Sequence, residues 1–361
     1  MSAQTIGIAG AGVMGRVLAW QLSRAGFSVS LFDKDDIDYG DAAAYTAAGM
    51  LTPYCEVESA ELMVYNLGMR SLDLWRDLAE ELEGDLGYHQ QGSLVVSHAH
   101  DRPDYETFNR QVLHKLDPTP EQYKKLNQQQ LALLEPDLGS AFSEATYLPE
   151  EAWLCPKLTL KVLADNLLEA DVNWYFNRLI HDVTAGTITT NEGQHHFDCV
   201  IDSRGLGAKP QWDELRGVRG ELVVLKAPEV NIKRLVRLMH PRYRLYVVPR
   251  GYDDLYVIGA TQIESNDKGP MTVRSSLELL SAAYSLHTGF AEARIVEMRA
   301  NCRPALKDNL PKIECSEGLI RVNGLFRHGF LLSPALAEEV TQCLTQPDYQ
   351  SSFSSLIQKV A

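Results

Sequence analysis

Hydrophobic and polar positions over the first 33 residues follow two different periods. Apolar runs over 5–9 and 28–32 predict two short buried strands. Between them, apolar residues at helical spacing predict a helix that ends near Ala25, with Gly26 as its cap. The pattern therefore predicts a strand–helix–strand unit of the kind that builds parallel sheets.

The rest of the chain continues to alternate helices with short strands. An apolar stripe over 62–82 predicts a long helix, with Ser59 placed to cap it. Ser333 followed by Pro334 predicts the start of the last helix. Further strands are predicted over residues 92–97, 172–176, 187–190, 195–197, 199–202, 220–225, 244–248, 255–258 and 319–324, and further helices over 159–170 and 273–288.

A glycine motif occupies the turn between the first strand and the first helix. Gly10 permits the tight turn, Gly12 lets backbone N–H groups approach a pyrophosphate, and Gly15 allows helix and strand to pack closely. Asp33, at the end of the second strand, would accept hydrogen bonds from a ribose diol. The alternative is a glycine turn with a purely structural role. It is disfavoured because the strand, the helix, the Gly26 cap and Asp33 all stand at the spacing of a dinucleotide-binding unit. The motif predicts dinucleotide binding without distinguishing FAD from NAD.

A second glycine turn follows the strand over 199–202. Gly205 and Gly207 stand where a strand ends, which again favours close approach of the backbone to a ligand. A plain strand–turn is the alternative at this position.

The pattern becomes β-rich between residues 218 and 261 and resembles one antiparallel sheet. Segments of the nucleotide-binding unit lie on both sides of it, whereas an NAD dehydrogenase usually completes its nucleotide fold in one run. We therefore predict an α/β protein with a discontinuous dinucleotide domain and an inserted α+β domain on an antiparallel or mixed sheet. The predicted dinucleotide domain comprises residues 1–85, 157–212 and 298–361, and the predicted substrate domain comprises 86–156 and 213–297.

Length, charge and cysteine pattern limit the kinds of partner and the cell compartment that we expect for this protein. The 361 residues favour about two domains, and the net charge of −14 argues against nucleic acid and against an anionic membrane surface. The chain has no apolar run of the roughly 20 residues that span a bilayer and no secretory leader pattern. Its six cysteines form no CxxC pair, which predicts reduced thiols, no metal site and a cytoplasmic location.

Several stretches, taken in order along nearly the whole chain, resemble the D-amino-acid oxidase (DAO) family of FAD enzymes. The glycine oxidase subgroup associated with thiamine biosynthesis is the most similar. The stretches that carry the resemblance are residues 47–53 (AAGMLTP), 92–94 (GSL), 219–220 (RG), 246–250 (YVVPR), 259–261 (GAT), 303–304 (RP), 308–311 (DNLP) and 326–329 (FRHG).

The resemblance implies a Rossmann-type domain that binds FAD noncovalently. Gly49 and Met50 would pass close to the flavin ring, and the N-terminus of the last helix would face its pyrimidine edge. Cys302 lies one position from the site of covalent flavin attachment in some relatives, and their flanking motif is absent here. The residues expected to bind FAD are Gly10, Gly12, Gly15, Asp33, Ala48, Gly49, Met50, Gly205, Gly329, Phe330 and Leu331.

The resemblance also implies where a substrate would bind. Arg303 stands at the position of the family's carboxylate-binding arginine, and a planar guanidinium suits a carboxylate. Tyr246 would offer its hydroxyl to the same carboxylate, Arg327 would support carboxylate or flavin, and Met50 would lie beside the substrate. A structural arginine and a core tyrosine are the alternatives.

The implied reaction is oxidative deamination of a small amino acid or secondary amine, such as glycine, sarcosine or a small D-amino acid. Hydride would pass from the substrate to FAD, and oxygen would accept the electrons, giving a 2-oxo acid, ammonia and hydrogen peroxide. No side-chain acid or base is required. An FAD dehydrogenase with another acceptor, a noncatalytic flavin-binding protein and an NAD dehydrogenase are alternatives, and the sequence is compatible with a homo-oligomer.

Four residues depart from the family pattern. Leu325 and His328 change the loop before the last helix, Glu314 replaces a glycine, and Arg204 replaces a small residue. These departures leave the substrate and the electron acceptor less determined than the cofactor.

Overall fold

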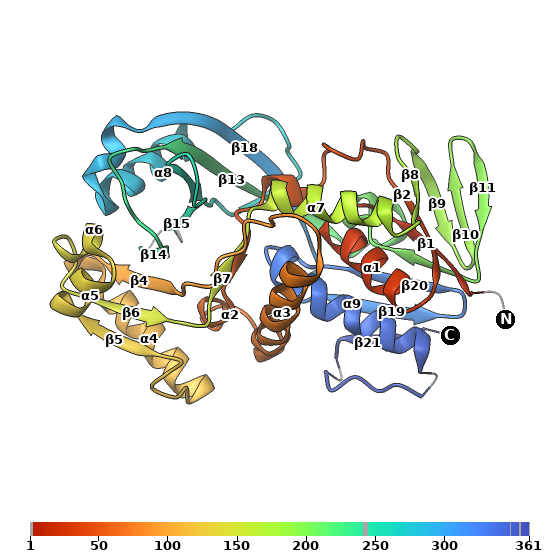
Figure 1. Cartoon of the computed structure of the whole chain (residues 1–361), viewed down its shortest axis with the longest axis horizontal. Coiled ribbons are helices and arrows are strands. Elements are labelled where there is room, and N and C mark those ends of the chain that lie inside the picture. Colours follow the sequence, from red (N-terminus) through yellow and green to blue (C-terminus); the bar gives the residue numbers. More distant parts are fainter. Residues whose placement is uncertain (1–2, 241–244, 347, 354, 361) are drawn as a thin grey trace.

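The structure contains two large β-sheets, which lie toward opposite ends of the long axis of the molecule (Figure 1). The computed structural model describes residues 3–240, 245–346, 348–353 and 355–360. The first sheet has the order β21-β19-β20-β12-β1-β2-β8. Its strands are β1 (Thr5–Ala9), β2 (Ser28–Phe32), β8 (Asn173–Tyr175), β12 (Cys199–Asp202), β19 (Lys312–Ser316), β20 (Leu319–Asn323) and β21 (Ile357–Lys359).

The seven-stranded sheet is the dinucleotide unit that the sequence predicts. β1 lies at its centre and runs parallel to both β2 and β12. Ile6 and Ile8 are fully buried in one core cluster with residues of four helices, and each such side chain contributes about 1.5–3 kcal/mol on burial. These helices are α1 (Val13–Arg24), α3 (Leu62–Glu81), α7 (Pro156–Glu169) and α9 (Gly329–Thr345).

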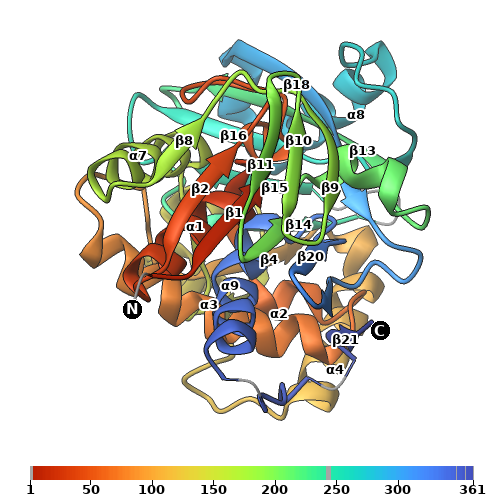
Figure 2. The ribbon, with the colours of Figure 1, turned by 90° about the vertical axis from the view of Figure 1, so that its right-hand side faces the viewer.

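A small antiparallel sheet covers the opposite face of the seven-stranded sheet, as Figure 2 shows. Its strands are β9 (Ile180–Thr184), β10 (Thr187–Thr190) and β11 (Gly193–His196). Val183 and Ile188 pack there against Phe32 and Val200. The predicted hairpin is therefore present, with one additional strand, and it closes the second face of the nucleotide unit.

The second large sheet has nine strands and is mixed. β13 pairs with β16 and β18 antiparallel, whereas β4 and β14 are parallel. The predicted domain boundary at residue 298 falls inside β18, which pairs with β13 from end to end. The strands are β4 (Ser93–Ser97), β5 (Lys124–Asn127), β6 (Glu144–Leu148), β13 (Arg216–Lys226), β14 (Leu235–Met239), β15 (Leu245–Pro249), β16 (Leu255–Gly259), β17 (Ile263–Glu264) and β18 (Arg294–Ala305).

The remaining elements are short or lie near the second sheet. The predicted strand over 244–248 is β15, and Arg244 lies outside the described residues. The remaining helices and strands are α2 (Pro53–Glu56), α4 (Arg102–Leu116), α5 (Gln128–Leu134), α6 (Pro136–Gly139), α8 (Val273–Leu286), β3 (Met50–Leu51) and β7 (Ala152–Trp153).

One predicted helix cap and one predicted helix start are wrong. α3 begins at Leu62, and Ser59 does not cap it; the hydroxyl of Ser59 instead accepts a hydrogen bond from Arg327. α9 begins at Gly329, four residues before the predicted cap Ser333.

Pro334 lies inside α9 because a tertiary contact replaces the hydrogen bond that proline removes. A proline has no N–H to donate to the carbonyl four residues earlier, which here belongs to Phe330. The indole Nε1 of Trp75, from α3, donates to that carbonyl at 2.7 Å. The first turn of α9 is thereby stabilised by another helix rather than by its own hydrogen bonds alone.

Candidate active site

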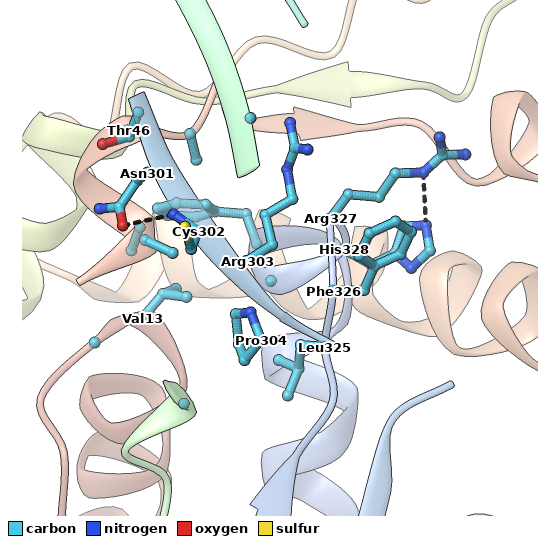
Figure 3. Close-up of a pocket in the computed structure, with 18 of the residues that line it drawn as sticks. Val13, Thr46, Asn301, Cys302, Arg303, Pro304, Leu325, Phe326, Arg327 and His328 are labelled. Atoms are coloured by element: carbon cyan, nitrogen blue, oxygen red, sulfur yellow. Dashed lines mark hydrogen bonds between the residues drawn. The ribbon is translucent and has the colours of Figure 1, made fainter. Parts of the chain in front are cut away.

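A cavity of about 990 Å³ is lined by residues of both large sheets and by the first turns of α1 and α9 (Figure 3). Its size is at the upper end of the roughly 300–1,000 Å³ range of ligand sites. All of the predicted site residues line it except Gly15, which lies beneath the turn that Gly10 forms. The structure therefore brings together residues that are as much as about 320 positions apart in the sequence.

The glycine turn of β1 and α1 forms one end of the cavity. Gly10 has a φ of +101°, and a Cβ on Gly15 would lie 1.8 Å from the carbonyl oxygen of Gly10. A Cβ on Gly12, by contrast, would meet only the Cβ of Ala42 at 3.7 Å. Gly12 therefore faces open space at the N-terminus of α1, which fits the pyrophosphate of a dinucleotide.

Asp33 lies beside this turn, immediately after β2. Its carboxylate accepts hydrogen bonds from the backbone N–H groups of Ala11 and Asp35, the latter at 2.9 Å. Burial raises the pKa of Asp33, although these N–H groups oppose the shift. Asp33 thus organises the turn itself, and its contact with a ribose stays a prediction.

Two glycine-containing segments, around Gly49 and Gly205, also line the cavity. Ala48, Gly49 and Met50 enter β3, and Gly49 has a φ of +79° in a position where a Cβ would lie 2.1 Å from the carbonyl oxygen of Leu154. Gly205 begins a 3₁₀ turn over Gly205–Gln211 with a φ of +54°. Glycine at both positions permits a left-handed backbone, and at Gly49 it also permits close approach of Leu154.

The first turn of α9 reaches the cavity because this helix starts early. Gly329, Phe330 and Leu331 all line the cavity. The first N–H groups of a helix have no intrahelical partner and carry its positive dipole end. This end of the cavity therefore favours a group that is or becomes negative.

One row of opposed residues crosses the nine-stranded sheet on the cavity side. Leu222 opposes Gly259, Gly259 opposes Tyr246, and Tyr246 opposes Arg237. Opposed residues project from the same face of a sheet. A Cβ on Gly259 would lie 2.5 Å from the Tyr246 hydroxyl, so the absence of a side chain there lets the tyrosine extend over the sheet.

Arg303, on β18, lies over a second glycine. A Cβ on Gly220 would lie 2.2 Å from Nη2 of Arg303, so the guanidinium occupies the space that this glycine leaves. Its Nη1 donates to the carbonyl oxygen of Thr261 at 3.2 Å. Arg303 and Tyr246 line the same cavity, and burial, the largest influence, lowers the pKa of Arg303 while raising that of Tyr246.

Six lysine and arginine side chains line the cavity, and five of them are paired with a carboxylate. Arg303 is the exception among the residues that the structure describes. The five pairs are Lys34–Asp41, Arg204–Asp202, Arg237–Glu58, Lys268–Asp41 and Arg327–Glu56. Arg303 is thus the position in the wall where, within the described part of the chain, a positive charge lacks a protein counter-ion.

Arg327 lines the cavity as predicted, but its guanidinium is bound by residues that the sequence did not single out. Its Nη2 donates to the carboxylate of Glu56 and, at 2.8 Å, to the hydroxyl of Ser59. Nε2 of His328 lies 3.0 Å from the same Glu56 oxygen. Glu56 ends α2, and no spacing in the sequence links it to a loop 271 residues away.

Glu56 is a buried anion held in place by two positively polarised neighbours. Burial opposes its charge, but the attraction of Arg327 and His328 outweighs burial and holds the pKa of Glu56 well below its ordinary value of 4.5. A carboxyl group with a depressed pKa in the folded state stabilises the protein at pH values above its unfolded pKa. That contribution is lost as the pH falls toward the folded pKa.

We expect Glu56→Gln to lower the free energy of unfolding by about 3 kcal/mol at pH 7, because it breaks a buried ion pair. The difference between wild type and variant should be constant from pH 6 to 8 and should shrink below about pH 4.5. Urea unfolding at several pH values measures it. A difference that does not change between pH 7 and pH 3 would contradict this account of Glu56.

The departures from the family pattern make internal contacts. Arg204 pairs with Asp202 at 2.7 Å, and Glu314 lies 3.2 Å from Lys312 on β19. Leu325 is buried in the cavity wall. The thiol of Cys302 also lines the cavity, where its Sγ lies 3.3 Å from the carbonyl oxygen of Asp267.

Within the described residues, no helix is both long and apolar enough to cross a bilayer.

Residues 5–343 match the model of a protein family described as FAD dependent oxidoreductase (DAO). A putative thiamine biosynthesis oxidoreductase ThiO from Rhizobium etli is 40% identical over 95% of this chain and 98% of its own length. A glycine oxidase from Geobacillus kaustophilus is 26% identical over 91% of this chain and 89% of its own length.

Solved structures agree with the fold. The crystal structure of glycine oxidase from Geobacillus kaustophilus covers 99% of this chain and 100% of its own, with a TM-score of 0.85 at 22% identity. The predicted α/β fold class is therefore confirmed. With its match over nearly the whole chain and its open glycine turn, the protein belongs to the DAO family of FAD-dependent oxidoreductases and is a flavoenzyme of the ThiO/glycine oxidase type.

Proposed function

We propose that this enzyme oxidises a small amino acid or secondary amine, with glycine, sarcosine and small D-amino acids as the substrate class. FAD, held noncovalently, supplies the two-electron acceptor, and oxygen takes up the electrons. For glycine the balanced change is glycine, oxygen and water to glyoxylate, ammonia and hydrogen peroxide. The names of the relatives ThiO and glycine oxidase support the substrate class.

The observation that carries the proposal is that Arg303 has no carboxylate partner among the residues that the structure describes. A half-buried guanidinium that has no carboxylate partner among the described residues is costly, and a substrate carboxylate would compensate its charge through two parallel hydrogen bonds. Tyr246 would add its hydroxyl to the same carboxylate. The two residues would hold the substrate by its carboxylate in the cavity that Met50 also lines, and would leave its Cα–H free to face the flavin.

The residues around the flavin site would provide binding and electrostatics. Gly10 and Gly12 would admit the pyrophosphate, Asp33 would accept from the ribose, and Ala48, Gly49 and Gly205 would lie against the cofactor. Gly329, Phe330 and Leu331 would direct their N–H groups at the edge that becomes negative on reduction. Arg327, already paired with Glu56, would support this end from the side.

The proposal is tested by adding glycine, sarcosine and D-alanine to the purified holoenzyme without oxygen and recording the flavin spectrum. Bleaching by at least one of them, followed by stoichiometric peroxide on admission of air, is expected. Bleaching without peroxide would replace the oxidase by a dehydrogenase. Flavin that none of a panel of small amines reduces would overturn the proposal.

We expect Gly220→Ala to raise KM for glycine about tenfold while leaving the FAD content unchanged. The new methyl group would lie 2.2 Å from Nη2 of Arg303, a flexible side-chain end that can shift away. A shifted guanidinium binds the carboxylate with poorer geometry, which removes about 1.4 kcal/mol of binding. Steady-state kinetics measures the effect, and an unchanged KM would place the substrate carboxylate elsewhere.

A further inference from the structure

Three other arginines line the cavity with Arg303, and one short stretch of chain supplies a glutamate to two of them. Arg327 pairs with Glu56 at the end of α2, and Arg237 pairs with Glu58, two residues later. Each of these guanidinium groups already has the carboxylate that a substrate could otherwise offer.

Arg237 is next to the proposed carboxylate site. It opposes Tyr246 in the row across the sheet, so both side chains leave the same face of neighbouring strands. Its side chain is only 7% exposed, and Nη1 donates to the carbonyl oxygen of Cys55 at 2.9 Å. Glu58 binds its other nitrogen from the segment after α2. Arg237 is therefore a buried cation that depends on Glu58 for its counter-charge.

A carboxylate that neutralises a wall arginine also affects which substrates the wall accepts. A second substrate carboxylate would have to displace Glu58 from Arg237, or lie near its negative charge without a partner of its own. Four arginines line the cavity, and three of them, Arg204, Arg237 and Arg327, are paired with a carboxylate. Within the described part of the chain, Arg303 is the arginine that remains available for a substrate carboxylate.

We propose that Glu58 is a specificity-determining residue, which by pairing with Arg237 restricts the site to amino acids with a single carboxylate. Glu56 does the same for Arg327. The inference rests on the proposed function and adds the exclusion of aminodicarboxylates. It predicts that removing the Glu58 charge creates a second carboxylate site rather than simply weakening the first.

Binding of unreactive acids to the holoenzyme provides a test that does not depend on turnover. Propionate and succinate are D-alanine and D-aspartate without their amino groups, and both can be titrated by the change in flavin absorbance. Wild type should bind propionate at least about tenfold more tightly than succinate. Glu58→Gln should shift that ratio toward succinate by about tenfold or more. The ratio of kcat/KM for D-aspartate to that for D-alanine should shift in the same direction.

Three variants separate a freed guanidinium from other effects. Glu61→Gln removes an exposed carboxylate from the cavity rim that has no ion pair in the described structure, and it should leave the ratio unchanged. Glu58→Asp keeps the counter-charge and should stay close to wild type. In Glu58→Gln with Arg237→Met, the gain for succinate should disappear.

The outcomes distinguish the inference from the function on which it rests. A wild type that oxidises small amino acids but binds succinate as tightly as propionate overturns the inference alone, and this holds even if Glu58→Gln does not fold. An unchanged ratio in folded Glu58→Gln, or an equal shift in Glu61→Gln, also overturns it. A wild type that binds neither acid and oxidises no small amino acid overturns both.

Discussion

Replacing Arg303 by alanine is expected to lower kcat/KM for glycine by about 10²- to 10³-fold, the largest effect of any single change in the substrate end of the cavity. Truncating one partner of a buried, hydrogen-bonded charge pair costs roughly 2–5 kcal/mol. Arg303 is the cavity cation for which the described chain provides no carboxylate. Removing it would therefore remove the substrate's main contact and not a structural ion pair.

Because Arg303 has no carboxylate partner in the described chain, its loss should affect substrate binding and not folding. FAD content and melting temperature of Arg303→Ala should stay close to wild type, because within the described residues its guanidinium bonds to the protein only through the carbonyl of Thr261. Arg303→Lys keeps the charge but not the planar fork, so it should recover only part of the loss. Steady-state kinetics with glycine measures both variants. A kcat/KM for Arg303→Ala within threefold of wild type would show that the carboxylate binds elsewhere.

Replacing Gly12 by alanine is expected to lower the affinity for FAD by at least about tenfold while the apoprotein stays folded. Gly12 has a φ of −68°, which alanine adopts readily, and its Cβ would point into open cavity. The protein itself should lose about 1 kcal/mol or less at this helix N-cap. The methyl group would instead occupy the space where the pyrophosphate must approach the backbone.

Gly15→Ala is the matched comparison for Gly12→Ala. Its Cβ would lie 1.8 Å from the carbonyl oxygen of Gly10, so this change must disturb the packing of α1 on β1. We expect Gly15→Ala to lower apoprotein stability and Gly12→Ala to spare it. Titration of apoprotein with FAD and thermal melting of apoprotein separate the two effects. Unchanged FAD affinity in Gly12→Ala would mean that the pyrophosphate does not lie against this turn.

The dinucleotide-binding unit could be predicted from the sequence because the residues that define it are close together in the chain. The glycine turn, the helix stripe and Asp33 lie within 33 consecutive residues, and each acts through its immediate neighbours. The resemblance to the family then indicated Arg303 and Tyr246, which the fold brings to one cavity. Their roles in binding substrate stay predictions.

The ion pairs in the cavity wall could not be predicted in the same way. Arg237 and Glu58 are 179 positions apart, and Arg327 and Glu56 are 271 apart. Charged residues in strands and turns are ordinarily solvated, so none of these four carries a periodic or spacing signal. Only the packing of α2 between the two sheets makes them partners.

The first turn of α9, where Trp75 donates to the carbonyl of Phe330, and the rest of the helix are stabilised in different ways. From Ser333 onward the sequence itself favours a helix start, with serine as a cap and Pro334 at the first helical position. The turn before it lacks that sequence signal and is supported in part by the indole N–H of Trp75, from α3. The positive end that faces the cavity thus depends in part on the assembled chain, and a fragment carrying α9 without α3 would lack that support.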